Sequence, residues 1–194
     1  MKIQGLFPTP IGFSENPSQK LIKSKLIKEC ELLKKKVKCG GDNWNSTVYN
    51  TCQTSNLHKN KKFDNLHNWI FNEVKVFADK LGYTNKKMFC ELSWFNYYNK
   101  HDYQEAHDHE GNEISAVYFL STPKDCGQLR FISPEPKGIK RVYIKNNPLT
   151  WREFKVIPKE GLLVMFKSNL IHDVQQNKSN KPRISLSYNF KIEY

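Results

Sequence analysis

The second half of the chain is a succession of short apolar segments separated by turn-forming residues. From about residue 91 onward, Pro, Gly, Asn or Asp interrupts each apolar run before it reaches the length of a helix. Short runs rich in β-branched and aromatic side chains, bounded by such residues, are typical of β-strands. At least six of them in succession predict an antiparallel sandwich or barrel. The segments read ELSWFNYY, EISAVYFL, GQLRFI, KRVYIK, EFKVIP, GLLVMF and PRISLSYNFKI.

The first part of the chain, residues 1–90, has the pattern of helices instead. Apolar residues recur at near-helical spacing over 18–38 and again, at intervals of three and four, over 61–82. Gly82 stands where a helix C-terminal cap is expected. A short strand is predicted within 44–51, which is rich in β-branched and aromatic residues. We therefore expect helices that support a β core within one domain of 194 residues.

The net charge of +12 comes almost entirely from lysine, because 27 of the 31 basic residues are Lys. The lysines concentrate in the 18–38 segment, on the side of the predicted helix that its apolar residues leave to solvent. A solvated basic helix is favoured over an anion-binding surface. Nucleic acid is therefore a less favoured partner, with Trp151 and Arg152 as the one aromatic and basic pair suited to it.

Several features predict a soluble protein of the cytoplasm. The sequence has no apolar run of about 18 residues, and its opening, MKIQGLFPTPIG, meets two prolines before a signal-peptide core could form. The five cysteines are odd in number and contain no CxxC pair, which argues against a disulfide framework or a zinc ribbon. We expect reduced thiols.

Three histidines are candidate metal ligands. His107 and His109 are two residues apart, so on an extended segment both imidazoles point to the same face and can bind one ion. His172 follows the apolar run GLLVMF and can reach the same ion from a distant strand. The remaining histidines have no such partners, and a structural role is expected for His58, His67 and His101.

The last predicted strand carries a candidate carboxylate anchor. Alternation over 183–190 gives one polar face with Arg183 and Ser185, and one apolar face. Arginine pairs bidentately with carboxylates, and a neighbouring Ser hydroxyl can donate a further hydrogen bond. Arg183 is one of only four arginines and comes eleven residues after His172, so a metal and a carboxylate are expected side by side. A surface ion pair is the alternative.

The order of these motifs resembles the 2-oxoglutarate/Fe(II)-dependent oxygenases, and more narrowly a bacterial and phage group of them that carries an HxH…H…RxS pattern. The resemblance spans about residues 92–190, and the opening LFPTPIG shows a weaker similarity to the same family. The matching features are WFN at 94–96, QEAHDH at 104–109, AVYFL at 116–120, Gly127, Leu129 and Phe131, the segment 158–166, His172, and Arg183 with Ser185.

The resemblance implies a double-stranded β-helix, a jelly roll of the cupin type, over residues 91–194, braced by N-terminal helices over 1–90. It implies Fe(II), 2-oxoglutarate and O2 as cofactors, with ascorbate as a candidate reductant, and release of succinate and CO2. The usual ligands are two histidines and one carboxylate. His109 stands here in the carboxylate position, so Asp108 and Glu110 are alternative ligands, although both have the wrong parity to share a strand face with His107.

The resemblance also assigns cofactor contacts. Arg183 would pair with the C5 carboxylate of 2-oxoglutarate and Ser185 would assist, while Tyr98 and Asn96 are further candidate contacts, with core packing as the alternative for both. Many relatives have a second aromatic hydroxyl on the strand that reads AVYFL. If Phe119 takes that position, its hydrogen bond to the cofactor is missing.

Three function classes follow. The favoured one is an oxygenase that hydroxylates a small molecule or a protein side chain. The alternatives are a three-His zinc hydrolase on a cupin-like barrel and a catalytically silent binding module of the same fold. The polar, Pro-containing segment 132–154 is predicted to lie over the barrel mouth and to select the substrate. The sequence leaves the substrate and the oligomeric state open. For a phage-encoded chain the expected compartment is the host cytoplasm.

Overall fold

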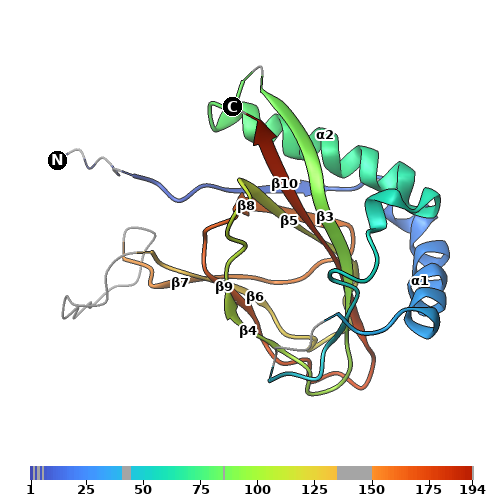
Figure 1. The fold of residues 1–194 in the computed structure, drawn as a ribbon. Coiled ribbons are helices and arrows are strands. Elements are labelled where there is room, and N and C mark those ends of the chain that lie inside the picture. Colours follow the sequence, from blue (N-terminus) through green and yellow to red (C-terminus); the bar gives the residue numbers. More distant parts are fainter. Residues whose placement is uncertain are drawn as a thin grey trace.

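The computed structural model describes residues 1, 3, 5, 7–40, 45–84, 86–134 and 150–193, and its strands form two antiparallel sheets that face each other (Figure 1). The major sheet has six strands in the order β1 (Ile11–Glu15), β8 (Leu162–Lys167), β5 (Ile114–Ser121), β10 (Arg183–Glu193), β3 (Lys87–Tyr98) and β2 (Tyr49–Asn50). The minor sheet has four, in the order β4 (Gln104–His107), β9 (His172–Val174), β6 (Leu129–Ile132) and β7 (Glu153–Val156).

The chain crosses repeatedly between the two sheets, which is the connectivity of a jelly roll. From β3 it passes to β4 in the minor sheet, returns to β5 in the major sheet, and goes on to β6 and β7 before it comes back to β8. The last crossing leads through β9 to β10, which lies between β5 and β3. The predicted fold class, mainly β with supporting helices, is confirmed.

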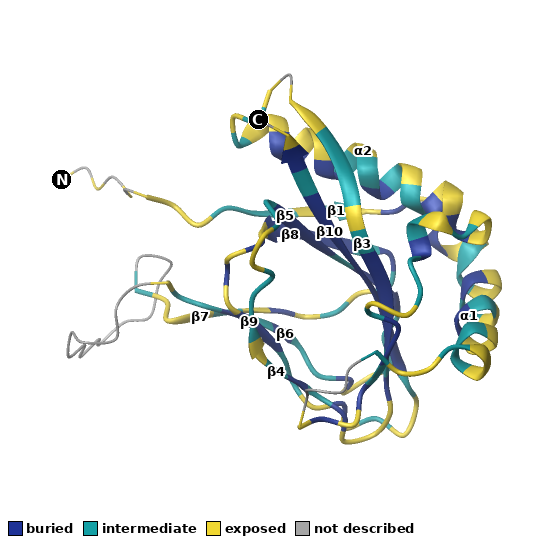
Figure 2. Ribbon diagram, in the orientation of Figure 1, coloured by how far each residue is buried: buried dark blue, intermediate teal, exposed yellow. Residues whose placement is uncertain are grey.

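Strand β10 separates an apolar layer from the barrel interior. Both of its faces are buried over almost its whole length, and it is among the most continuously buried strands in Figure 2. Its apolar residues Ile184, Leu186, Tyr188 and Phe190 pack in the core cluster shared with the helices. The alternation of the strand therefore turns its polar residues, which begin with Arg183, toward the interior between the two sheets.

Two helices cover the outer face of the major sheet (Figure 1). The predicted helices over 18–38 and 61–82 form as α1 (Gln19–Lys36) and α2 (Asp64–Lys80), the latter preceded by two 3-10 turns, η1 (Leu57–Lys59) and η2 (Lys61–Phe63). Gly82 adopts the positive φ, 93°, of a helix-terminating residue. Each helix buries one stripe of apolar residues against the sheet and exposes the opposite side (Figure 2).

The expected strand within 44–51 is reduced to the two residues of β2. In the described part of that segment, the Ser46 hydroxyl accepts hydrogen bonds from the backbone N–H groups of Val48 and Tyr103. Such local side-chain bonds compete with a strand ladder. Pairing with β3 therefore starts only at Tyr49, which lies opposite Tyr97.

Strand β1 comes from the N-terminal part of the chain, for which mostly helices were expected. It pairs with β8 along the edge of the major sheet, with Ile11 opposite Phe166 and Glu15 opposite Leu162.

The predicted strand KRVYIK at 140–145 lies outside the described residues. All five cysteines are free thiols. None of the helices in the described ranges has the length and apolar character needed to cross a membrane.

Candidate metal centre

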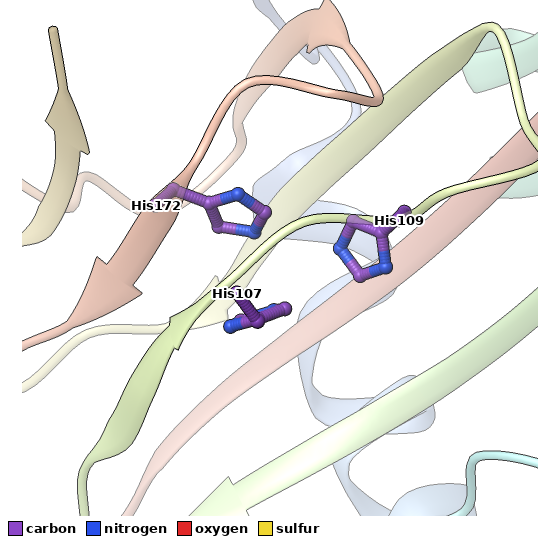
Figure 3. Close-up of side chains that lie close together, drawn as sticks. All are labelled: His107, His109 and His172. Atoms are coloured by element: carbon purple, nitrogen blue, oxygen red, sulfur yellow. The ribbon is translucent and has the colours of Figure 1, made fainter. Parts of the chain in front are cut away.

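Three imidazoles meet in the space between the two sheets. Within the described part of the chain, His107, His109 and His172 form a cluster in which one potential ligand atom from each residue lies within 4.8 Å of the others. Their ring centroids are 4.3 Å apart for His107 and His172, 5.0 Å for His107 and His109, and 5.1 Å for His109 and His172. Figure 3 shows the three rings close together, with His107 and His109 on one segment of the chain and His172 on the neighbouring strand.

The strand pairing explains why residues 65 positions apart in sequence converge. Strand β4 ends at His107, directly opposite His172 at the start of β9. The chain then turns away from β4, and the backbone N–H of His109 donates to the carbonyl of Ser168 at 2.9 Å. That bond brings His109 beside the other two rings. The two histidines of the HxH pair therefore converge although only His107 belongs to the regular strand and His109 lies beyond its end.

Backbone carbonyls orient two of the three imidazoles. The Nδ1 of His107 donates to the carbonyl oxygen of Glu105 at 2.7 Å, and the Nδ1 of His172 donates to that of Leu170 at 2.9 Å. Because a carbonyl only accepts, Nδ1 carries the proton in both rings and Nε2 keeps its lone pair. Such bonds are the usual means by which metal-ligating histidines are held in one tautomer.

Burial keeps all three imidazoles neutral. It lowers the pKa of His107, and the nearby backbone carbonyl and carboxylates only partly oppose this effect. Burial, and after it the repulsion that a protonated His107 would exert, lowers the pKa of His109 to about 3. The pKa of His172 falls well below its usual value, first because of burial and then because of the two neighbouring histidines. Neutral imidazole is the form that binds a metal ion.

The two carboxylates considered as alternative ligands lie outside this cluster. Asp108 and Glu110 both belong to the described residues, and the group of ligand atoms within 4.8 Å of one another comes from histidines alone. The turn at Gly111, where φ is 81°, comes after both residues and does not bring either into the group. The geometry therefore favours an all-nitrogen set of ligands.

Arg183 is buried at the start of β10 without an acidic partner. Only 1% of the residue is exposed, and its guanidinium carbon lies 3.9 Å from the ring centroid of Tyr98. Its Nη1 donates to the carbonyl of Cys126 at 3.2 Å, whereas its Nε has no hydrogen-bond partner among the described residues. No Asp or Glu in the described chain forms an ion pair with it. The alternative of a surface ion pair is wrong.

The other predicted cofactor contacts lie along the same inner wall. Ser185, which is 3% exposed, lies opposite Asn96 of β3 and Phe119 of β5. The Tyr98 hydroxyl donates to Gln104 Oε1 at 2.8 Å, and burial raises the pKa of Tyr98 although Arg183 and Ser185 oppose the shift. These side chains line the interior around the guanidinium.

Asn96 is engaged within the protein. Its Oδ1 accepts from Trp94 Nε1 at 3.2 Å, and its Nδ2 donates to Ser187 Oγ at 3.1 Å.

Gln104, the partner of the Tyr98 hydroxyl, was not among the residues predicted from the sequence. The register of β4 shifts between Gln104 and His107, and such a bulge lets both side chains reach the interior although they differ in parity. Strict alternation could not have found it.

The two adjacent aromatic residues of β5 face opposite ways. Tyr118 belongs to the helix-side cluster, and its hydroxyl donates to the Oε1 of Gln19 on α1. Phe119 belongs to the interior cluster and lies opposite Ser185. The interior position therefore carries a ring without a hydroxyl, as the sequence allowed.

Three neutral imidazoles and an unpaired guanidinium, enclosed in one jelly roll, fit a divalent metal and a carboxylate ligand, which defines the class of metal-dependent jelly-roll enzymes. The chain belongs to the 2-oxoglutarate/Fe(II) oxygenases, because the model of the family described as "Putative 2OG-Fe(II) oxygenase" matches residues 92–189, half of the chain. It is a 2-oxoglutarate- and Fe(II)-dependent oxygenase. No curated protein matches the chain.

Solved structures of other proteins share the fold. A prolyl-4-hydroxylase from Pseudomonas putida is 18% identical, with a TM-score of 0.67 over 96% of this chain and 94% of the other. The non-heme alpha-ketoglutarate-dependent epimerase SnoN from nogalamycin biosynthesis is 14% identical, with a TM-score of 0.65 over 93% and 78%. The viral collagen prolyl hydroxylase of Paramecium Bursaria Chlorella virus-1 is 14% identical, with a TM-score of 0.59 over 93% and 94%.

Proposed function

We propose that His107, His109 and His172 hold the Fe(II) of this oxygenase and that Arg183 anchors the C5 carboxylate of 2-oxoglutarate. With O2, the bound iron and 2-oxoglutarate supply the oxidising power for hydroxylation, and 2-oxoglutarate leaves as succinate and CO2. The Tyr98 ring lies against the guanidinium, and Ser185, beside Tyr98, offers a hydroxyl group to the same carboxylate. The Tyr98 hydroxyl would exchange its hydrogen bond to Gln104 for one to the carboxylate. The neutral histidines bind without first losing a proton.

The observation that carries the proposal is the unpaired Arg183. A guanidinium buried to 99% without a carboxylate is costly, and a bidentate carboxylate ligand would relieve that cost. A three-His zinc hydrolase has no use for such a group. The dicarboxylate cofactor of the family supplies both a group for the metal and a group for the arginine.

The interior around the site excludes water on the apolar side. Phe131 and Phe166 pack against the His172 ring with centroid distances of 5.9 and 4.8 Å, and both are buried. Phe119 continues this apolar lining toward Ser185. A dry surrounding strengthens the charge-assisted bonds of the arginine and limits side reactions.

We propose that the substrate approaches from the end of the barrel where β6 ends and β7 begins. The backbone N–H of Ile132, the last residue of β6, donates to the carbonyl of Ile171, next to His172. Strand β6 therefore ends, and β7 begins, beside the histidines. Residues 135–149, most of the predicted substrate-selecting segment, lie outside the described residues.

The substrate class proposed is a small molecule or a peptide or protein side chain. Among the proteins of the same fold, two are named as prolyl hydroxylases and others as enzymes of nogalamycin biosynthesis, so both classes are represented. We further propose that the chain acts as one domain in the cytoplasm, its own or that of a phage host, where its free thiols stay reduced.

The direct test is the release of succinate from 2-oxoglutarate by the purified protein with added Fe(II), O2 and ascorbate. We expect slow turnover without substrate and faster turnover when a mixture of metabolites or peptides contains the substrate. Absence of succinate with bound iron would refute the oxygenase assignment.

The ligand assignment is tested by metal content. We expect His109→Ala to lower Fe(II) binding by about 10-fold or more, because one of three ligands is lost. Asp108→Asn and Glu110→Gln, the matched controls, should leave binding unchanged. The opposite pattern would show that a carboxylate is the ligand.

A further inference from the structure

One of the three clustered imidazoles lacks the support that the other two have. The Nδ1 atoms of His107 and His172 are held by backbone carbonyls. In the described chain, by contrast, neither ring nitrogen of His109 has a hydrogen bond, and the residue lies beyond the end of β4. A side chain that is free to rotate must be ordered when a metal binds, which weakens binding unless packing holds it already.

Trp94 provides packing for this ring. Its centroid lies 5.7 Å from that of His109, with 59° between the ring planes. The indole is 5% exposed and is itself fixed, because its Nε1 donates to Asn96 Oδ1 at 3.2 Å. Asn96 in turn donates to Ser187 Oγ at 3.1 Å.

The strands place these groups in one rigid unit. Trp94 and Asn96 are two residues apart on β3 and share its inner face, and Ser187 lies opposite Trp94 on β10. Their polar side-chain atoms bond mainly to one another in a buried region. Breaking one bond would leave a buried polar group unpaired, so the arrangement of the indole is strongly determined.

We propose that Trp94, Asn96 and Ser187 are positioning residues that fix the imidazole of His109 for metal binding. The inference rests on the proposed role of the three histidines. It assigns a role to the Trp94–Asn96 pair that differs from the cofactor contact expected of Asn96, since that amide is already engaged on both sides. The support takes the place of the backbone carbonyl that orients the other two rings.

The test measures binding of Co(II), as a spectroscopic substitute for Fe(II), to the full chain. We expect Trp94→Phe, which keeps a ring but loses the Nε1 donor, and Asn96→Leu, which removes the anchor, each to raise the dissociation constant about 10-fold. The double variant should lose little more than either single one, because both act through one unit. Trp69→Phe is the matched control, since Trp69 packs on Tyr118 on the helix side and should leave Co(II) binding unchanged.

A second comparison shows whether the effect passes through His109. In a His109→Ala background, Trp94→Phe and Asn96→Leu should change the residual Co(II) affinity by less than about twofold. A purely structural role would lower affinity equally in both backgrounds and would overturn the inference. If Asn96→Leu does not fold, Ser187→Ala, which removes the far end of the unit, replaces it, and a smaller increase in the same direction is expected.

The outcomes separate this inference from the proposed function. If the unaltered protein binds no Co(II), the histidine site itself is wrong. If it binds Co(II) and Trp94→Phe and Asn96→Leu bind it equally well, the histidine site stands and the support is refuted.

Discussion

At the scale of single residues, Arg183 is almost fully buried and has no carboxylate partner among the described residues. Burial lowers the pKa of its guanidinium, and Tyr98 and Cys126 only partly oppose this shift. The arginine nonetheless stays charged, because its ordinary pKa lies far above neutrality. The contact with the Tyr98 ring stabilises the cation by a cation–π interaction but leaves its Nε without an acceptor.

Arg183→Lys keeps the positive charge and removes the planar fork. Loss of a bidentate, charge-assisted pair costs about 1.5–3 kcal/mol, so we expect the dissociation constant of 2-oxoglutarate to rise roughly 10- to 100-fold. Iron binding should survive, because Arg183 is outside the histidine cluster. Anaerobic titration of the iron complex, followed through its metal-to-ligand charge-transfer band, measures both. Equal constants for the two proteins would exclude Arg183 as the anchor.

Phe119 offers a gain-of-affinity test. Its ring lies in the interior opposite Ser185, so Phe119→Tyr adds a hydroxyl near the proposed carboxylate site. A hydrogen bond to a charged group stabilises, and crowding in the packed interior offsets part of the gain, so we expect 2-oxoglutarate to bind about threefold more tightly. Tyr118→Phe is the control, because that hydroxyl bonds to Gln19 on the helix side. Weaker binding by Phe119→Tyr would mean that the carboxylate lies elsewhere.

The sequence predicted those residues whose side chains follow strand alternation. Arg183 and Ser185 face the interior because β10 alternates regularly along β3 there, and the HxH pair turns inward where β4 ends. Gln104 could not be predicted, because the register shift in β4 interrupts the alternation of inward and outward side chains. The hydrogen bond from Asn96 to Ser187 could not be predicted either, because bonds between strands depend on their register. Register between β3 and β10 is set by the whole fold rather than by either segment.

At the scale of elements, α2 brings a second pair of histidines together behind the major sheet. The rings of His58 and His67 are 5.7 Å apart, and His67 stacks on Tyr188 of β10 at 5.9 Å. His58 hydrogen-bonds Ser93 of β3, whereas the Nδ1 of His67 has no partner among the described residues. Both were expected to be structural, and they join α2 and η1 to β3 and β10.

This pair makes stability depend on pH. Burial lowers the pKa of His58, with a further contribution from His67, and it lowers the pKa of His67. The unfolded chain therefore binds protons more readily, so the contribution is fully present above the ordinary pKa of about 6.5 and is lost as the pH falls below it. The three site histidines act in the same direction in the metal-free protein.

We expect His67→Phe, which keeps the stacked ring, to reduce this loss. Urea unfolding of the metal-free protein at about pH 7.5 and about pH 5.5 should show a smaller drop for the variant, by less than the ~1.4 kcal/mol per pH unit that one fully titrating group gives. The discount follows because His67 is only half-buried. The same drop in both proteins would remove His67 as the cause.

The helices and most strands could be predicted because their signals are local. Periodicity placed α1 and α2, and short apolar runs placed β3, β5, β6, β8 and β10. Strand β1 could not be predicted in the same way, because five residues between two proline-containing stretches become a strand only by pairing with β8. Tertiary pairing decided that element.

At the scale of the whole molecule, the main apolar core and the candidate site lie on opposite faces of the major sheet. The helices and the outer side of the major sheet form the larger apolar core, whereas the space between the sheets combines a smaller apolar cluster with the histidines and the arginine. The polar residues of the site are thus supported from behind by a separate core. Ligands that bind in the interior should therefore stabilise the entire domain rather than one loop.

Thermal unfolding with successive ligands distinguishes the three function classes. A ligand at about 100 times its dissociation constant stabilises by about 2.7 kcal/mol, which corresponds to a rise of about 5–10 °C in Tm for a domain of this size. We expect Fe(II) alone to raise Tm, and 2-oxoglutarate to raise it again in the wild type but clearly less at the same concentration in Arg183→Lys, because the variant binds 2-oxoglutarate roughly 10- to 100-fold more weakly. For a zinc hydrolase, the metal would raise Tm and 2-oxoglutarate would leave it unchanged, because the chemistry of such an enzyme does not need a buried guanidinium. A silent binding module would show both shifts without releasing succinate, so the two shifts together with turnover identify the oxygenase. A decrease of the second shift alone in Arg183→Lys locates its cofactor.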